Sequence, residues 1–329
     1  MAELAMPDYS TVMQARKRLH GLAVRTPLLS YPVLDERVGG RVLLKPEIFQ
    51  RTGSFKFRGA YNRVSEIEAD TPGTPVVACS SGNHAQGVAA AATLHGVSST
   101  IIMPADAPAI KRSRTQALGG RLILYDRAHD DRDKIVERAC AETGAAFVPP
   151  FDDAGVISGQ GTVGLEIAED AGAYGRLDAV LIPAGGGGLT AGIALALGAS
   201  LPDTRLFTVE PAGFDDHARS FASGSRQSNA SRAGSICDAL LSEQPGQITF
   251  AINGPRASGG LCVSDDEARQ AVAYAFRELK LVVEPGGAVA LAALLSGKLD
   301  VSGKTVCAVL SGGNIDPELF GAIIADGTG

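Results

Sequence analysis

Several features that mark other protein classes are missing from this sequence of 329 residues. Acidic residues outnumber basic ones by 36 to 30, so the chain lacks the basic face that nucleic-acid binding requires. No apolar run reaches the length of a membrane-spanning helix. The five cysteines are scattered and show no CxxC spacing, which argues against a zinc site or a disulfide framework and favours reduced thiols.

The N-terminal residues Met1-Ala2-Glu3-Leu4 lack the basic and then apolar pattern of a signal peptide. With the reduced cysteines, this predicts a soluble, cytoplasmic protein. Hydrophobic residues make up 45% of the chain and charged residues 20%, a balance that allows a large buried core. The length is large for a single core, so two domains are expected.

Apolar runs and helical patterns alternate along most of the chain, which predicts parallel βαβ units. The expected strands are Val42–Lys45, Pro75–Cys79, Thr100–Met103, Arg121–Tyr125, Ala146–Val148, Asp178–Pro183, Leu206–Glu210 and Thr305–Leu310. The expected helices are Tyr9–Leu19, Ala85–Leu94, Lys111–Ala117, Asp131–Thr143, Gly161–Ala171, Leu189–Gly198, Asp265–Leu279 and Ala288–Leu295. The stretch 214–246 is rich in Ser, Gly, Asn and Arg, so it is expected to be mostly loop.

This pattern predicts an α/β protein with two open parallel-sheet lobes and a cleft between them. We expect a large domain of residues 1–74 and 153–329. A small α/β domain, residues 75–152, is expected as an insertion in it.

Lys56 lies in the segment Ser54-Phe55-Lys56-Phe57-Arg58-Gly59-Ala60, among apolar side chains and glycine. Desolvation and cationic neighbours lower the pKa of a lysine, and a neutral amine attacks an aldehyde to form a Schiff base. The alternative is a lysine that extends its ammonium group to water along its apolar stem. Lys56 is therefore a candidate Schiff-base lysine, and the other motifs must decide between the two alternatives.

Four consecutive glycines, Gly185-Gly186-Gly187-Gly188, follow a predicted strand and precede a predicted helix. The amides of such a turn and the helix N-terminus bind anions, above all phosphate. Gly186, Gly188 and Ala191, with Glu210 at the end of the next strand, also fit a dinucleotide fingerprint, and a glycine turn required only for packing is a further alternative. A P-loop is excluded because no Gly-Lys-Ser/Thr follows.

Two more polar turns follow predicted strands. Ser80-Ser81-Gly82-Asn83-His84 could bind a carboxylate through its hydroxyls and amides, although Ser81 or Asn83 could equally serve as an ordinary helix N-cap. Ser311-Gly312-Gly313-Asn314 ends the last predicted strand. Ligands of parallel sheets bind at this edge, so the loops are expected to meet at one site.

Three carboxylates, Glu210, Asp215 and Asp216, lie within seven residues. A solvated acidic loop is the ordinary interpretation, and a site for a hard cation with oxygen ligands is the alternative. His217 is expected to be an exposed loop residue rather than a ligand.

Taken together, these motifs resemble the fold-type II pyridoxal-phosphate (PLP) enzymes, which are tryptophan synthase β-like in fold, and most nearly the serine/threonine dehydratase and serine racemase group. The resemblance extends from Arg25 to Gly312. It depends on five motifs in the family's order: Ser-Phe-Lys-x-Arg-Gly-Ala, Ser-Ser-Gly-Asn-His, Gly-Gln-Gly-Thr at 159–162, the four glycines and Ser-Gly-Gly-Asn. It displaces the NAD-binding oxidoreductase as the leading hypothesis, because that class explains the glycines but not Lys56.

The resemblance implies that the cofactor lies in the cleft between the lobes. Lys56 would hold it as a Schiff base and then remove the α-proton of the substrate. Phe55 would pack on the pyridine ring, Asn83 would hydrogen-bond its 3-oxygen, and Ser311 would face its nitrogen. Gly185, Gly186, Gly187 and Gly188 would hold the phosphate.

Substrate contacts are implied in the same way. Ser80, Ser81, Asn83 and His84 would bind the substrate carboxylate, and Ser81 matches the acid/base of the racemases. Arg132 resembles an arginine that meets the distal carboxylate of dicarboxylic ligands in that group. The alternative for Arg132 is a surface side chain that pairs with the neighbouring aspartates.

Glu210, the carbonyl of Phe214 and Asp216 match the family's site for a divalent cation such as Mg²⁺, Mn²⁺ or Ca²⁺. Two departures from the family pattern stand near the expected cofactor. Cys237-Asp238-Ala239 replaces the usual Ala-Asp-Gly, and Phe151 occupies the position of an asparagine in mammalian-type racemases.

The resemblance implies a lyase that eliminates water from L-serine or L-threonine to give a 2-oxo acid and ammonia. The alternatives are a 3-hydroxyaspartate dehydratase and an amino-acid racemase of the serine or aspartate type. A homodimer is expected, with a small amino acid as its substrate. Because the chain stops at residue 329, a stand-alone enzyme of amino-acid catabolism is also expected.

Overall fold

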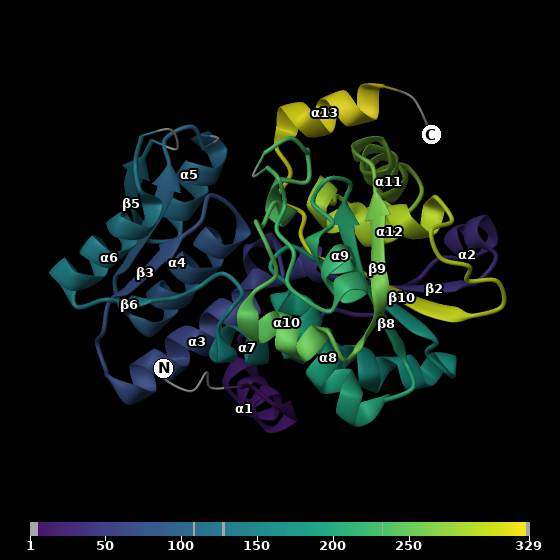
Figure 1. Cartoon of the computed structure of the whole chain (residues 1–329), viewed down its shortest axis with the longest axis horizontal. Coiled ribbons are helices and arrows are strands. Elements are labelled where there is room, and N and C mark those ends of the chain that lie inside the picture. The colour runs from purple at the N-terminus through teal and green to yellow at the C-terminus, as the bar shows by residue number, and fades with distance from the viewer. Residues whose placement is uncertain (1–5, 108, 127–128, 232, 327–329) are drawn as a thin grey trace.

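The computed structural model describes residues 6–107, 109–126, 129–231 and 233–326. In this part of the chain, a six-stranded and a four-stranded sheet form two lobes, which Figure 1 shows side by side. The large sheet has the order β1 (Leu29–Ser30), β2 (Arg41–Pro46), β10 (Thr305–Leu310), β7 (Ala179–Pro183), β8 (Arg205–Pro211) and β9 (Ala257–Val263). The small sheet has the order β5 (Gly120–Tyr125), β4 (Ser99–Pro104), β3 (Val76–Cys79) and β6 (Ala146–Phe147).

The strand pairs in both sheets are parallel, apart from the antiparallel pair of β1 and β2 at one edge. Both faces of each sheet are buried. In β7, Ala179 and Leu181 enter one hydrophobic core while Val180 and Ile182 enter the other. A parallel sheet covered on both faces explains why its strands appear in the sequence as continuous apolar runs. The predicted α/β fold with two open parallel-sheet lobes is confirmed.

Helices cover the large sheet on both sides. One core takes side chains from α2 (Pro32–Val38), α11 (Asp265–Arg277), α12 (Pro285–Leu295) and α13 (Pro317–Ala325). The opposite core takes them from α7 (Ala154–Ala171), α8 (Gly188–Ser200) and α10 (Gln247–Asn253). Two further helices lie outside these layers: α1 (Tyr9–Leu19) packs against α7, and α9 (Asp216–Ser223) packs against β9.

The small sheet lies between α4 (Asn83–His95) on one face and α6 (Arg132–Thr143) on the other, with α5 (Ala109–Ala117) beside β5. The helix α3 (Lys56–Asp70) contacts both α4 of the small lobe and α7 of the large lobe. The strands of the small sheet all fall within residues 75–152. Because α3 contacts both lobes, the domain limits themselves stay a prediction.

Several elements differ from the sequence-based expectation. Four short 3-10 helices are present within the described residues, at Glu47–Phe49, Arg51–Gly53, Gly172–Tyr174 and Asp238–Leu240. The stretch 214–246 is mostly loop, as predicted, but its first part forms α9, a helix that was not predicted and whose buried residues are polar. The strand β9 was not predicted, because glycines interrupt its apolar run. The helix α3, which begins at Lys56, was not predicted either. Among the described residues, none of the helices combines the length and apolar character needed to cross a membrane.

Candidate active site

A cavity of about 740 Å³ opens between the two lobes. Loops that follow the carboxyl ends of strands from both sheets line it, which is where open parallel sheets bind ligands. The cavity brings together the predicted cofactor and substrate residues: Phe55, Lys56, Ser80, Ser81, Asn83, His84, Arg132, Gly185, Gly186, Gly187, Gly188 and Ser311. The predicted metal ligands Glu210, Phe214 and Asp216 do not line it.

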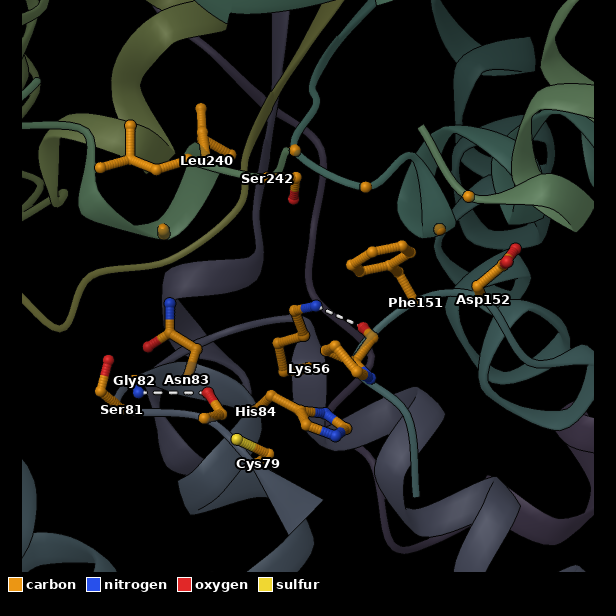
Figure 2. A pocket seen from close by; sticks show the side chains of 18 of the residues that line it. Lys56, Cys79, Ser81, Gly82, Asn83, His84, Phe151, Asp152, Leu240 and Ser242 are labelled. Carbon is orange, nitrogen blue, oxygen red and sulfur yellow. Dashed lines mark hydrogen bonds between the residues drawn. The ribbon is translucent and has the colours of Figure 1, made fainter. Parts of the chain in front are cut away.

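Lys56 is the first residue of α3, and its partly buried side chain reaches into the cavity (Figure 2). Its Nζ donates a hydrogen bond to the carbonyl oxygen of Pro150 at 2.6 Å and lies 5.2 Å from the centre of the Phe55 ring. Desolvation lowers the pKa of this amine to about 8. Part of the amine is therefore neutral near physiological pH, and the neutral form is the one that attacks an aldehyde.

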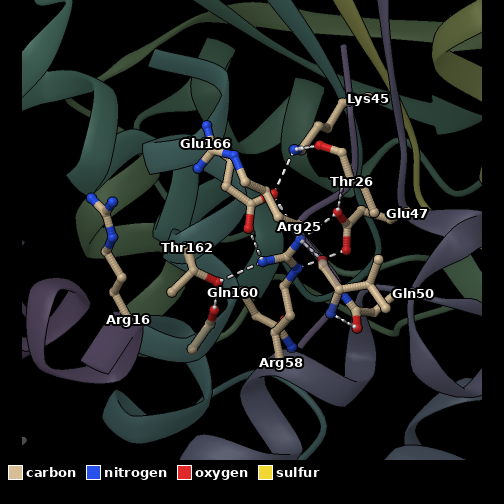
Figure 3. A network of polar contacts seen from close by, with 12 residues as sticks. Arg16, Arg25, Thr26, Lys45, Glu47, Gln50, Arg58, Gln160, Thr162 and Glu166 are labelled. Atoms are coloured by element: carbon tan, nitrogen blue, oxygen red, sulfur yellow. Dashed lines mark hydrogen bonds and ion pairs between the residues drawn. The ribbon is translucent and has the colours of Figure 1, made fainter. Parts of the chain in front are cut away.

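A buried ionic network fixes the helix that carries Lys56 (Figure 3). The guanidinium group of Arg58 donates to both oxygens of Glu47 and both oxygens of Glu166, at 2.7–2.9 Å. Lys45 donates to Glu166 at 2.6 Å. Two cations and two carboxylates compensate one another here, and removing one member of such a buried set costs about 3–5 kcal/mol. The network therefore anchors the start of α3 to β2 and α7.

The four glycines follow β7 and open α8. None of the described residues accepts a hydrogen bond from the amides of Gly185–Gly188, so these N–H groups and the helix N-terminus are available to an anion. At Gly186 a Cβ atom would lie 2.3 Å from the ring of Phe151. The hydroxyl of Ser242 lies beside Gly185, where a Cβ atom would meet it at 3.2 Å. The sequence analysis did not identify Ser242.

The motif Ser80–His84 follows β3, and its last two residues, Asn83 and His84, begin α4. No side chain caps α4, whose N-cap residue is Gly82, so N-capping by Ser81 or Asn83 is wrong as an alternative. His84 is buried, and its Nε2 hydrogen-bonds the carbonyl oxygen of Val148 at 2.9 Å. Burial, with a smaller effect of Lys56, lowers the pKa of His84 to about 3, so its ring is neutral and Nε2 is the donor. A direct contact of His84 with a substrate stays a prediction.

Asn83 lies in the small lobe, but its side chain is bound to the large lobe. Its Nδ2 donates to Glu284 at 2.6 Å, and its Oδ1 accepts from Asn314 at 2.7 Å. Ser311, which follows β10, is buried and also lines the cavity. Neither Glu284 nor this use of Asn83 was predicted, since the partners are 201 residues apart in the chain.

Arg132 begins α6 and lines the cavity, while its Nε donates to the carboxylate of Asp133 at 3.0 Å. Its side chain is 49% exposed, which fits both alternatives for its role. Lys111 of α5 also lines the cavity and pairs with Asp238 of the large lobe, so an ion pair spans the mouth of the cleft.

The predicted cation site is a buried acidic pair behind the glycine loop. Glu210 accepts from the backbone amides of His217 and Ala218 at 2.8 and 2.9 Å, and burial with the nearby Asp216 raises its pKa well above the usual range. The Oδ1 of Asp216 accepts a hydrogen bond from the Nδ2 of Asn229 at 2.7 Å. The Oδ2 of Asp216 is buried and has no hydrogen-bond partner among the described residues. Burial raises the pKa of Asp216 to about 6. The solvated acidic loop is therefore wrong.

The side chain of Phe214, two residues before Asp216, is also buried. The described residues contain no group of three His, Cys, Asp or Glu side chains arranged around one metal position. A cation here would therefore need backbone oxygens or water as additional ligands. His217 is fully buried in α9, so its predicted exposure is wrong as well.

Comparison with known proteins identifies the family. A family model described as "Pyridoxal-phosphate dependent enzyme" matches residues 20–312. The chain is 39% identical over 322 residues to the L-threo-3-hydroxyaspartate ammonia-lyase of Saccharomyces cerevisiae, with 98% of each chain covered. It is 40% identical to the threonine deaminase of a crystal structure from T.th., with a TM-score of 0.88 and with 94% of this chain and 99% of that one covered. Maize serine racemase is 34% identical, with a TM-score of 0.91 and 98% of each chain covered. This chain therefore belongs to the family of pyridoxal-phosphate dependent enzymes.

Proposed function

We propose that this protein is a PLP-dependent ammonia-lyase that eliminates water from β-hydroxy amino acids. L-Serine and L-threonine are the first-choice substrates, and the products are a 2-oxo acid and ammonia. The observation that carries the proposal is the amine of Lys56. This amine lies in the cavity between the lobes, and its pKa is lowered to about 8. The four glycines line the same cavity, and none of the residues that the structure describes accepts a hydrogen bond from their amides.

The residues of the cavity fit the two ends of this cofactor. Lys56 would bind the aldehyde, and the amides of Gly185–Gly188 would bind the phosphate at the N-terminus of α8. Phe55 and Ser311 would contact the pyridine ring and its nitrogen. When bound, the cofactor supplies a sink for the electrons released at the α-carbon of the substrate.

Lys56 would then act as the base. Its neutral amine takes the α-proton as the Cα–H bond breaks, and the Cβ–O bond breaks as the hydroxyl group leaves with a proton as water. The released enamine reacts with water to give the 2-oxo acid and ammonia. The lowered pKa of Lys56 keeps part of the amine in the base form at the working pH.

The substrate carboxylate would bind at the start of α4, beside Ser80, Ser81 and His84. The free amides of this helix end favour an anion. The side chain of Asn83 is already engaged with Glu284 and Asn314, so its proposed contact with the cofactor 3-oxygen requires a rearrangement of those bonds.

A second candidate is a dehydratase of 3-hydroxyaspartate. It is favoured by Arg132, which lines the cavity and could bind a second carboxylate with its planar guanidinium group. The similarity to the yeast L-threo-3-hydroxyaspartate ammonia-lyase supports this candidate. Racemisation by Ser81 as the acid/base on the face opposite Lys56 is the further alternative, supported by the similarity to maize serine racemase.

A divalent cation between Glu210, the carbonyl of Phe214 and Asp216 is also part of the proposal. The buried and unpartnered Oδ2 of Asp216 supports it, because a cation would neutralise two carboxylates that otherwise repel each other. We further propose a small domain of residues 75–152, a homodimer, and a cytoplasmic location. These three rest on the sequence alone.

The test is a substrate panel. The purified protein is incubated with L-serine, L-threonine and L-threo-3-hydroxyaspartate, and 2-oxo acid, ammonia and the enantiomeric composition of the remaining amino acid are measured. We expect equal amounts of 2-oxo acid and ammonia from at least one of them. Inversion of the amino acid without 2-oxo acid would replace this proposal with the racemase.

A further inference from the structure

Three buried side chains hold the carbonyl groups of the glycine loop from behind. The Nε2 of His217 donates to the carbonyl of Gly185 at 2.9 Å. The hydroxyl of Thr249 donates to the carbonyl of Gly186 at 2.7 Å, and the Nδ2 of Asn253 donates to that of Gly187 at 3.1 Å. His217 comes from α9, and Thr249 and Asn253 come from α10, so two separate helices contribute to one feature.

Together with the backbone amides of Gly246 and Ala191, which donate to the carbonyls of Gly186 and Gly187 at 3.2 and 2.9 Å, these bonds determine where the amides of the loop point. The peptide group is planar, and its C=O and the following N–H point in opposite directions. A carbonyl held on the side of α9 and α10 therefore directs the next N–H to the other side. The amides of Gly186, Gly187 and Gly188 therefore point away from α9 and α10. None of the residues that the structure describes accepts a hydrogen bond from them.

The three donors are fixed in their places. Each is fully buried, and His217 and Asn253 pack so closely on Gly187 that a Cβ atom there would lie 2.5 Å and 2.9 Å from them. Because the carbonyl of Gly185 offers only an acceptor, His217 must carry its proton on Nε2. The N-terminus of α10 is fixed in turn by Asp152, which accepts from the amides of Gln247 and Ile248 at 2.8 and 2.9 Å.

We propose that His217, Thr249 and Asn253 are positioning residues that set the affinity of the glycine loop for the phosphate group of the cofactor. This inference rests on the proposed function, because it takes the loop as the phosphate site. Amides that are already held in position lose little conformational entropy when they bind an anion. Loss of any one donor should therefore weaken phosphate binding. The three residues do not line the cavity, so they act on an anion there only through the glycine loop.

The test compares two ligands that differ only in the phosphate. The full-length protein, freed of cofactor, is titrated with pyridoxal 5'-phosphate and with pyridoxal, and the Kd of each is measured from visible absorbance. Thr249→Val, Asn253→Leu and His217→Phe remove one donor each at similar volume. In each variant we expect Kd for pyridoxal 5'-phosphate to rise about five- to tenfold, the effect of one lost hydrogen bond, while Kd for pyridoxal is unchanged.

Two further variants separate positioning from folding. Thr249→Ser keeps the hydroxyl and should restore the parent affinity. Thr208→Val is the matched control, since Thr208 is equally buried, lies in β8 and has no described partner for its hydroxyl. It should leave the ratio of the two Kd values unchanged.

An equal loss for both ligands, or no loss for either, would overturn the proposal. The readout is binding, so it is independent of the reaction. A parent protein that binds the phosphorylated ligand tightly but releases no 2-oxo acid would contradict the proposed function and leave this inference standing.

Discussion

The carboxamide of Asn83 in the small lobe donates to the carboxylate of Glu284 in the large lobe at 2.6 Å. The carboxyl group of Glu284 is almost fully buried, and burial, with the charge of Asp238, raises its pKa to about 7. This bond therefore joins the two lobes beside the cavity through a group that titrates near physiological pH.

Glu284 should make the stability of the protein depend on pH. Because its pKa in the folded state lies above the ordinary value of 4.5, its ionised form is disfavoured by folding. The penalty is absent below about pH 4.5, where both states are protonated, and it grows as the pH rises through about 7, to at most about 3 kcal/mol. Glu284→Gln should therefore melt higher than the parent above neutral pH and equally in acid. Melting temperatures of both proteins across this range check it, and a constant difference would contradict it.

Arg132→Ala should separate the two candidate substrates. If Arg132 binds a second carboxylate, kcat/KM for 3-hydroxyaspartate should fall about ten- to a hundredfold, as expected for a lost charge-assisted bond, and kcat/KM for serine should not change. Arg138→Ala is the matched control, because Arg138 is exposed on the same helix and does not line the cavity. An equal loss for both substrates would assign Arg132 to the fold through its pair with Asp133.

Ser81→Ala should abolish any racemisation, because one face of the α-carbon loses its proton donor. Elimination should persist at a reduced rate, since Lys56 still removes the α-proton. Chiral analysis of recovered serine alongside 2-oxo acid release measures both. Racemisation at the parent rate would remove Ser81 from this role.

Much of the fold was predictable from local patterns, and most of the support around the site was not. Most strands of the two sheets were identifiable because two buried faces make them continuously apolar, as in β7, whereas the glycines of β9 hid that strand. The residues that hold the site come together only in the folded chain. Glu284 hydrogen-bonds Asn83, and Thr249 hydrogen-bonds Gly186, although 201 and 63 positions separate the partners in the sequence. Local sequence patterns carry no information about such contacts. His217 was misjudged because a buried polar helix has no apolar periodicity.

Metal should act on stability through the buried acidic pair. Mg²⁺, Mn²⁺ or Ca²⁺ bound only by the folded state should raise the melting temperature, with a gain of about 2.7 kcal/mol at a free concentration of a hundred times Kd. Chelator should reverse the rise, and Asp216→Asn should abolish it. A melting temperature of the parent protein that ignores both metal and chelator would contradict a cation at Glu210 and Asp216.

The most direct test of the account is to identify the residue that bonds the cofactor. The protein loaded with PLP is reduced with borohydride, digested, and searched by mass spectrometry for the lysine that carries the pyridoxyl group. We predict the label on Lys56 alone, and no label and no 2-oxo acid release in Lys56→Ala. A label on another lysine, or full activity of Lys56→Ala, would contradict the central claim.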